Sequence, residues 1–199
     1  MLKYNSLPKK VKEYNNLKVE EISPIMKLNI RGKSNDLLTN GDFNKGSSFF
    51  AIVGKISDMI LPTEANTSAF SEKLTSLWLG PDEWMIISND KQDKNTNTFE
   101  IEEFLFNNIS KAKLGSVTNV TDQFVIINIS GDKVFDLLST GCPLNFNEFK
   151  TKKGAVAQTL LLQVDVIFHH KEINSVNIFI RRSFSEHLMS WIDDAASRF

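Results

Sequence analysis

Histidine and cysteine are the residues of this chain whose chemistry suits metal binding or nucleophilic attack, and their spacing offers little support for either. His169 and His170 are adjacent at or just past a predicted strand end, where neighbouring residues point to opposite faces of the sheet. The pair therefore does not bind one metal ion from a regular strand, and no HxH, HxxxH or CxxC pattern completes a site. We favour a solvated strand end for both residues. His187 is expected at the surface or in a packing contact.

Cys142 is the single cysteine and precedes Pro143, with no base beside it in the sequence. A nucleophilic cysteine would need a histidine from elsewhere in the chain, so a small buried apolar residue is the favoured interpretation. The segment Gly131-Asp132-Lys133 matches neither GxGxxG nor GxxxxGK[ST], the patterns that cradle phosphates. We therefore predict no catalytic, metal-binding or cofactor-binding residue in this chain.

The most distinctive segment is a tryptophan-flanked turn. Pro81 suits position i+1 of a turn and Asp82 position i+2, which predicts a hairpin with its tip at residues 80–83. The two tryptophan rings are either core residues or interface anchors, and we favour core rings with an exposed turn. The whole motif is our candidate subunit interface, and it consists of Trp78, Leu79, Gly80, Pro81, Asp82, Glu83 and Trp84.

Composition excludes several function classes. Lys and Arg total 23 and Asp and Glu total 24, so the formal net charge is −1 and no basic field attracts nucleic acid. The N-terminal residues have no apolar signal-peptide core, and no apolar stretch approaches the roughly 20 residues of a membrane-spanning helix. A single cysteine rules out an internal disulfide and favours the cytoplasm.

The elements that must position these residues follow from apolar periodicity. The first half reads as a strand over 26–31 closed by Gly32, a helix over 49–60 that ends before Leu61-Pro62, two hairpin strands and a second helix. The second half reads as a strand closed by Ser130-Gly131 and a short helix stopped by Gly141. A long strand and a partner strand follow, and Ser183 and Glu186 have the spacing of a capping box for the last helix. The ranges predicted for the remaining elements are 74–78, 84–88, 98–109, 124–129, 134–138, 160–168, 176–180 and 188–199.

The two halves repeat the same order of elements, with strand, helix, turn, strand, strand and helix in each. Residues 28–32 correspond to residues 127–131, and Trp84 to Ser88 correspond to Asn177 to Arg181. A period near one hundred residues indicates a duplicated α+β unit rather than a solenoid. We predict an N-terminal arm over 1–24, a first repeat over 25–115 and a second repeat over 116–199.

The segment Leu77 to Ser88, LWLGPDEWMIIS, resembles the signature of the gamma subunits of heterotetrameric sarcosine oxidase. Three later features agree with that family in order: residues 120–123 running to Ser130-Gly131, the turn Gly141 to Leu144, and Gln158-Thr159 followed by Arg182-Ser183-Phe184. Together these features cover Leu77 to the C-terminus. Before Leu77 the likeness is one of pattern alone.

The resemblance implies a non-catalytic subunit in a cytoplasmic complex with alpha, beta and delta subunits. In that family the complex oxidatively demethylates sarcosine to glycine and passes the formaldehyde equivalent to tetrahydrofolate. FAD, FMN, NAD and the folate site belong to the larger subunits, and zinc belongs to the delta subunit. The gamma chain is similar to the folate-binding fold of aminomethyltransferases. The sequence leaves open which N-methylated amine is oxidised, because relatives act on compounds such as N-methylglutamate.

Two other members of this superfamily are alternatives. A stand-alone folate-dependent aminomethyltransferase is about twice as long and carries an additional barrel domain. A folate-binding iron–sulfur-assembly protein is marked by a Lys-Gly-Cys stretch, whereas here Lys153-Gly154 is followed by Ala155. Both alternatives predict a chain that binds folate without partner subunits.

Overall fold

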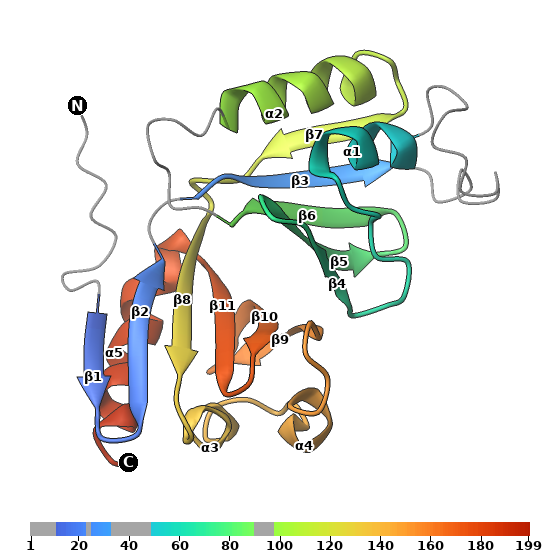
Figure 1. Cartoon of the computed structure of the whole chain (residues 1–199). Helices are drawn as coiled ribbons and strands as arrows, with labels where there is room; N and C mark the ends of the chain where they lie inside the picture. Colours follow the sequence, from blue (N-terminus) through green and yellow to red (C-terminus); the bar gives the residue numbers. More distant parts are fainter. Residues whose placement is uncertain (1–10, 23–24, 33–48, 90–97) are drawn as a thin grey trace. The chain divides into compact units, whose positions relative to one another are not determined.

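The computed structural model describes residues 11–22, 25–32, 49–89 and 98–199. The chain divides into two units, one formed by residues 24–121 and the other by residues 1–23 together with 122–199. Each unit contains one antiparallel sheet (Figure 1). We call them the five-stranded unit and the six-stranded unit.

The five-stranded unit has the strand order β4-β5-β6-β3-β7. Its elements in chain order are β3 (Lys27–Gly32), α1 (Phe49–Ser57), β4 (Ser68–Phe70), β5 (Leu74–Gly80), β6 (Glu83–Ser88), α2 (Thr98–Leu105), a π-helical turn (Phe106–Ser110) and β7 (Gly115–Asn119).

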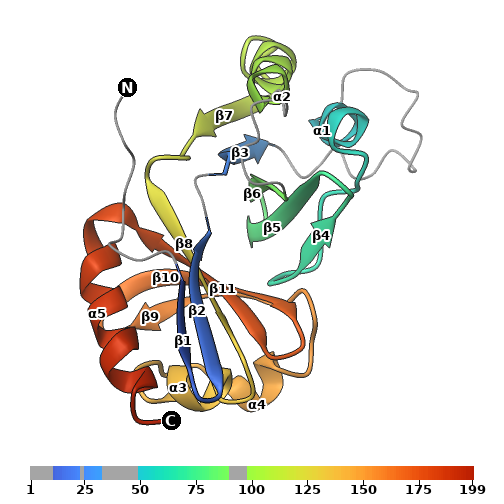
Figure 2. The same cartoon turned by 60° about the vertical axis from the view of Figure 1, so that its left-hand side comes forward.

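Helices α1 and α2 cover one face of the five-stranded sheet (Figure 2). Alternate residues of β3, Leu28 and Ile30, point to this face and are fully buried. They pack with Phe49 and Val53 of α1 and with Leu105 of α2. The alternation of apolar and polar residues in β3 therefore reflects a sheet with one face covered by helices.

The six-stranded unit has the strand order β1-β2-β8-β11-β10-β9. Its elements are β1 (Val11–Tyr14), β2 (Leu17–Ile22), β8 (Phe124–Ser130), α3 (Val134–Ser139), α4 (Phe146–Phe149), β9 (Val156–Leu161), β10 (Val164–Glu172), β11 (Ser175–Arg181), a 3₁₀ turn (Arg182–Phe184) and α5 (Ser185–Ala196).

Helix α5 runs along one face of this sheet (Figure 2), where Leu188 and Ile192 are fully buried. They join one apolar cluster with Ile127 and Ile129 of β8 and with Leu137 of α3. Burying an aliphatic side chain of this size contributes about 1.5 to 3 kcal/mol, so the α5 stripe is a main source of this unit's stability.

The two units repeat one arrangement, which confirms the predicted α+β duplication. Strands β4, β5, β6, β3 and β7 follow each other in one sheet as β9, β10, β11, β8 and β2 do in the other. The strands that end next to Gly32 and Gly131 therefore hold the same place, as predicted. Each repeat has three strands after its first helix rather than the two predicted. β4 has only three residues, and the predicted strand over 160–168 spans the end of β9 and part of β10.

The register of the repeat differs by one residue from the predicted match. Ile30 pairs with Trp84, and the corresponding Ile129 pairs with Val176 rather than with Asn177. Trp84 and Val176 both point to the helix-covered face of their sheets. A one-residue slip moves a side chain to the other face. The register is therefore set by which side chains are buried, and matching the two sequences letter by letter misses it by one residue.

The outer strands are exchanged between the repeats. β2, which precedes β3 in the chain, pairs with β8, whereas β7, which precedes β8, pairs with β3. Residues 11–22 are therefore two strands of a sheet rather than part of an arm. For the same reason the chain passes between units after Thr121 rather than at residue 115. Residues 1–10, 23 and 24 of the predicted arm lie outside the described residues.

Two further predictions differ from the structure. The predicted strand over 160–168 is a hairpin of β9 and β10, because Leu162 and Gln163 adopt positive φ values of 50° and 65° and reverse the chain. The predicted capping box is absent: α5 begins at Ser185, whose Oγ donates to the Arg182 carbonyl oxygen at 2.8 Å. Phe184 occupies the N-cap position and makes no side-chain cap.

Candidate subunit interface

The candidate motif forms the β5–β6 hairpin, as predicted. Trp78 pairs with Trp84 and Gly80 pairs with Glu83, so the strand register shifts between Trp78 and Gly80. Pro81 lies with Asp82 in the exposed turn. An irregularity of this kind twists a strand and redirects the side chains next to it.

Trp84 anchors the hairpin in the core of the five-stranded unit. Its ring is 1% exposed, and its indole Nε1–H donates to the Pro62 carbonyl oxygen at 2.8 Å. The rings of Phe49 and Phe50 lie 5.6 Å and 5.3 Å from it, between centroids. The Trp78 ring is partly exposed and packs against the same cluster. The tryptophans are therefore primarily core residues.

Glu83 is bound within its own sheet. Its carboxylate accepts a hydrogen bond from Asn29 Nδ2 at 2.6 Å and pairs with the Arg31 guanidinium at 2.5 Å. Burial acts to raise the pKa of Glu83, but the hydrogen bonds from Asn29 and Arg31 outweigh it, so the pKa is lowered. Glu83 thus fixes the hairpin against β3 and is not a freely available contact for a partner.

The turn also has a folding role that the other repeat reproduces. The Gly32 amide donates to the Asp82 carbonyl oxygen at 3.1 Å, and the Gly131 amide donates to the Asn174 carbonyl oxygen at 2.9 Å. In the five-stranded unit the β5–β6 turn is therefore tied to the end of β3, and in the six-stranded unit the β10–β11 turn is tied to the end of β8. The Asp82 side chain remains exposed.

Gly80 has no comparable role in the fold. Its φ lies outside the positive region, and a Cβ added there would lie 3.6 Å from the nearest atom, Glu83 Cβ, an ordinary contact. By contrast, a Cβ at Gly32 would lie 2.3 Å from the Phe49 ring. The five-stranded unit itself therefore does not require glycine at position 80.

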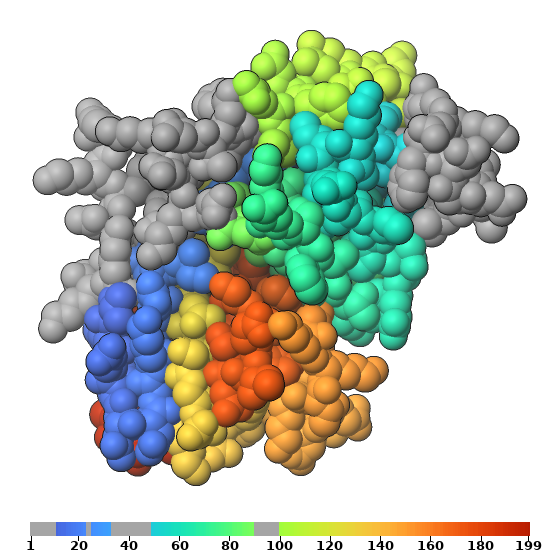
Figure 3. Space-filling model, in the orientation of Figure 1, coloured from blue at the N-terminus to red at the C-terminus, as the bar shows by residue number. Residues whose placement is uncertain are grey.

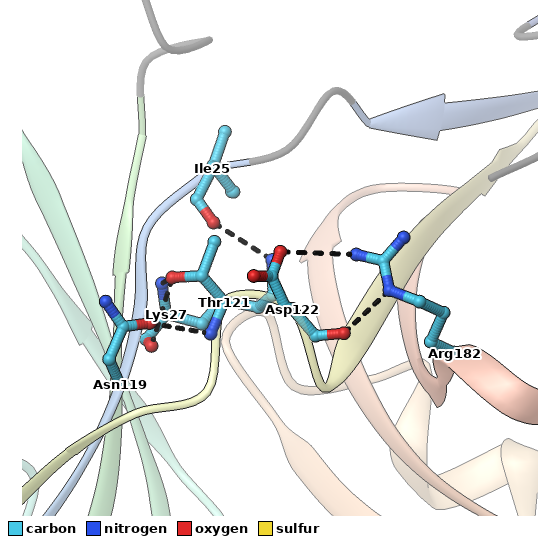
Figure 4. Close-up of polar contacts among 6 residues, drawn as sticks. All are labelled: Ile25, Lys27, Asn119, Thr121, Asp122 and Arg182. Carbon is cyan, nitrogen blue, oxygen red and sulfur yellow. Dashed lines mark hydrogen bonds and ion pairs between the residues drawn. The ribbon is translucent and has the colours of Figure 1, made fainter. Parts of the chain in front are cut away.

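The other resemblance motifs meet in pairs within the six-stranded unit. Arg182 Nε donates to the Asp122 carbonyl oxygen at 2.7 Å, and its guanidinium lies 3.7 Å from the Asp122 carboxylate (Figure 4). Cys142 Sγ lies 3.8 Å from Thr159 Oγ1. The positions of these motifs along the chain do not by themselves predict that they pair.

A second polar group holds the chain just before Asp122 (Figure 4). The Lys27 amide donates to Thr121 Oγ1 at 3.0 Å, and the Thr121 amide donates to Asn119 Oδ1 at 2.9 Å. Lys27 is only 2% exposed, and its Nζ donates to the Ile25 carbonyl oxygen at 2.9 Å. Thr121 is thus held by contacts within the five-stranded unit.

The two adjacent histidines point to opposite faces of β10 but are buried rather than solvated. His170 is 3% exposed, packs against the Phe135 and Phe149 rings and shares a 2.9 Å hydrogen bond between Nδ1 and the Lys152 carbonyl oxygen. His169 is 6% exposed, and burial lowers its pKa to about 4. The prediction of a solvated strand end is wrong because β10 continues past both residues to Glu172.

The remaining candidate residues hold no recognisable site. Cys142 is buried and His187 is exposed. Within residues 11–22, 25–32, 49–89 and 98–199, no group of three or more His, Cys, Asp or Glu side chains is placed to hold a metal ion. No helix in these ranges is long and apolar enough to cross a membrane.

Comparison with solved structures identifies the fold. The heterotetrameric sarcosine oxidase from Corynebacterium sp. U-96, solved in complex with pyrrole 2-carboxylate, matches with a TM-score of 0.76 and 20% identity over 96% of this chain and 88% of that one. The glycine cleavage system aminomethyltransferase T from Bartonella henselae matches with a TM-score of 0.56 and 14% identity, over 92% of this chain and 49% of that one. The aminomethyltransferase-like fold predicted from the sequence is therefore confirmed.

Comparison of sequences gives the family. The sarcosine oxidase subunit gamma of Corynebacterium sp. (strain P-1) is 26% identical over 155 residues, which cover 77% of this chain and 72% of that protein. The family model described as "Sarcosine oxidase, gamma subunit family" matches residues 41–198, most of the chain. The chain therefore belongs to the sarcosine oxidase gamma subunit family.

Proposed function

We propose that this chain is the non-catalytic assembly subunit of a heterotetrameric sarcosine oxidase, in the cytoplasm. The complex oxidatively demethylates sarcosine to glycine and transfers the formaldehyde equivalent to tetrahydrofolate. Family membership supports this proposal. The partners are the alpha, beta and delta subunits, which hold FAD, FMN, NAD, zinc and tetrahydrofolate.

The β5–β6 hairpin is the proposed contact surface of the five-stranded unit. The observation that carries this proposal is Gly80: neither its backbone conformation nor the space around it requires glycine. A glycine that the fold does not need is explained by close approach of another chain. Pro81 restricts the turn before binding, so less conformational entropy is lost when it is covered.

Substitutions in the turn test this surface. We expect Gly80→Ala and Asp82→Ala to leave the melting temperature of the lone chain unchanged and to weaken binding to the other subunits by tenfold or more. Asp136→Ala, which removes an exposed carboxylate of α3, is the matched control and should bind normally. Binding is measured by titrating each variant against the purified complex of the remaining subunits.

The outcomes separate the subunit assignment from the contact surface. Failure of the unsubstituted chain to bind the flavin-containing subunits would contradict the assignment itself. Normal binding by both turn variants would instead show that the motif serves folding alone. A stoichiometric flavin in the purified lone chain would contradict the non-catalytic role.

A further inference from the structure

The turn between β10 and β11 exposes a large apolar side chain. Ile173 is 83% exposed, more than any other large apolar side chain in the described part of the chain. Glu172 pairs with Ser175 across the hairpin, so Ile173 and Asn174 form the turn. Turn positions favour Gly, Asn, Asp, Pro and Ser, and an isoleucine gains almost no burial there. The packing of the six-stranded unit therefore does not account for isoleucine at this position.

Ile173 holds the place that Pro81 holds in the other repeat. In both hairpins the strand register shifts just before the turn. In both, the second turn residue, Asp82 or Asn174, accepts a backbone hydrogen bond from a glycine amide. The β5–β6 turn is the proposed contact surface of the five-stranded unit. The duplication thus supplies a second turn of the same construction, with a larger apolar side chain at its tip.

Three contacts hold the β10–β11 turn in place. The Gly131 amide donates to the Asn174 carbonyl oxygen at 2.9 Å, and Asn174 Nδ2 donates to Asp132 Oδ1 at 3.0 Å. On the other side of the turn, the Glu172 carboxylate pairs with Lys153 Nζ at 2.7 Å. A turn that is already ordered loses less conformational entropy when a partner covers it. The exposed apolar side chain is therefore presented on a preorganised support.

Lysines gather beside this turn. The segment between α4 and β9 carries exposed Lys150, Lys152 and Lys153 and lies at the surface (Figure 3, orange). The ion pair between Lys153 and Glu172 joins this segment to the turn, and Lys171 is exposed next to Glu172. Within the part of the chain that the structure describes, Lys150, Lys152 and Lys171 make no ion pair. The surroundings of the turn therefore carry excess positive charge.

We propose that Ile173 is an anchor that inserts into an apolar pocket of another subunit, and that carboxylates on the rim of this pocket meet the lysines. This proposal rests on the proposed function, because it requires a complex. In protein interfaces a few well-packed anchors near the centre carry most of the binding energy. Complementary charges around them mainly raise the rate of association and fix the orientation.

A second copy of this chain and a membrane surface are poorer partners for the same turn. Two copies that met through this turn would bring their lysines together, and like charges across an interface oppose association. A single myristoyl chain binds a membrane only marginally, and an isoleucine side chain is much smaller. Charge complementarity and the small apolar area thus favour a pocket on a different protein chain.

Substitutions at the tip test the anchor by titration against the purified complex of the remaining subunits. We expect Ile173→Asn to keep the melting temperature of the lone chain and to bind at least tenfold more weakly, whereas Ile173→Leu binds normally. Phe70→Asn, at the 71% exposed side chain of β4, is the matched control and should also bind normally.

The outcomes separate this anchor from the subunit assignment. Normal binding by Ile173→Asn overturns the anchor and leaves the assignment intact. Equal weakening by Phe70→Asn overturns it in favour of unspecific apolar contact. Failure of the unsubstituted chain to bind the other subunits contradicts the assignment and the anchor together.

A charge reversal tests the rim of the pocket. We expect Lys171→Glu to slow association at low salt, and the difference from the unsubstituted chain to shrink at high salt, because salt screens exposed charges. Lys55→Glu, at an exposed lysine of α1, changes the net charge equally and is the control. Stopped-flow mixing measures the rates. Equal slowing by the two variants overturns the acidic rim.

Cross-linking from the tip identifies the partner directly. With the photoreactive residue p-benzoylphenylalanine at position 173, we expect illumination of the assembled complex to join this chain to another subunit. An assembled complex without such a cross-link overturns the proposal, and cross-links between copies of this chain overturn it in favour of a second copy. Binding of the lone chain to phosphatidylglycerol vesicles, lost in Ile173→Asn, overturns it in favour of a membrane surface.

Discussion

Trp84 shows how one residue combines packing with a specific polar contact. Its ring lies among the phenylalanines of α1, and its indole nitrogen satisfies the carbonyl oxygen of the buried Pro62. Buried carbonyl groups are costly to leave without a partner. Trp84 therefore ties the loop after α1 to the β5–β6 hairpin.

Truncation at position 84 is expected to cost more than loss of the indole N–H alone. Trp84→Ala should lower the free energy of unfolding by about 3 to 5 kcal/mol. Trp84→Phe keeps an aromatic ring but leaves the Pro62 carbonyl unpaired, for about 1 to 3 kcal/mol. Urea titration measures both, with Trp78→Phe at the partly exposed ring as the control. Equal losses for Trp84→Phe and Trp78→Phe would contradict the role of the hydrogen bond.

His169 predicts the acid sensitivity of the six-stranded unit. Burial lowers its pKa to about 4 in the folded chain, against an ordinary value of 6.5; Lys171 and His170 act in the same direction, and Glu172 opposes them. A depressed folded pKa gives stability that is present above pH 6.5 and is lost as the pH falls towards 4. His169→Gln should therefore flatten the fall in unfolding free energy between pH 7 and pH 4.5.

The control for this pH dependence is His187→Gln, at an exposed position of α5. Urea titrations at a series of pH values compare the slopes of the three proteins. We expect the unfolding free energy of His187→Gln to change with pH as steeply as that of the unsubstituted chain, and that of His169→Gln to change less steeply than both. A His169→Gln slope that equals the unsubstituted one would show that other groups dominate acid unfolding.

At the scale of elements, glycines at the ends of β3 and β8 keep these strand ends in place. Gly131 has a φ of 127°, and a Cβ there would lie 2.2 Å from the Asn16 carbonyl oxygen in the β1–β2 turn. Both the conformation and the close approach require glycine. The end of β8 and the hairpin of β1 and β2 are thus fitted to each other at this residue.

Gly131→Ala is therefore expected to destabilise the six-stranded unit. A side chain in a disallowed backbone region costs about 1 to 3 kcal/mol, and displacement of the Asn16 backbone adds to that. Gly80→Ala, where the added methyl has room, is the matched control. Thermal melts of the two variants provide the comparison, and equal melting temperatures would contradict the assigned role of Gly131.

An element of the fold could be predicted from the sequence when the residues that determine it lie within its own segment. The β5–β6 hairpin and β3 were predictable because alternation and Pro81 lie within the segment itself. The turn at Leu162 and Gln163 contains no Gly, Asn or Asp, so the usual signal for positive φ is missing. β2 alternates only briefly, and its partner β8 lies far along the chain. That the fold tolerates a side chain at position 80 could be seen only in the structure, from the space around Gly80.

At the scale of the whole molecule, the sheet of each repeat includes a strand that directly precedes the first strand of the other repeat: β2 precedes β3 but pairs with β8, and β7 precedes β8 but pairs with β3. Leu17 and Val19 of β2 are buried in the core of the six-stranded unit, although residues 24–121 separate them from β8 in the chain. Sheets built from distant strands are completed late and depend on every strand being present.

Deletion of residues 1–22 should therefore unfold the six-stranded unit selectively. It removes β1 and β2 and exposes one side of β8, while all strands of the five-stranded unit remain. We expect amide exchange over residues 124–181 to become fast and exchange over residues 74–88 to remain slow. Deletion of residues 1–10 alone, which keeps both strands, is the control. Simultaneous loss of protection in both regions would show that the units unfold as one.

The exchanged strands also set an order of events during synthesis. β2 leaves the ribosome roughly 100 residues before β8, and domains generally begin to fold as they emerge. The five-stranded unit is complete once β7 has emerged, and β8 follows immediately in the chain. Until β8 has been synthesised, β2 has no partner strand other than β1. The first two strands of the chain are therefore incorporated into the six-stranded sheet only after the second repeat has been made.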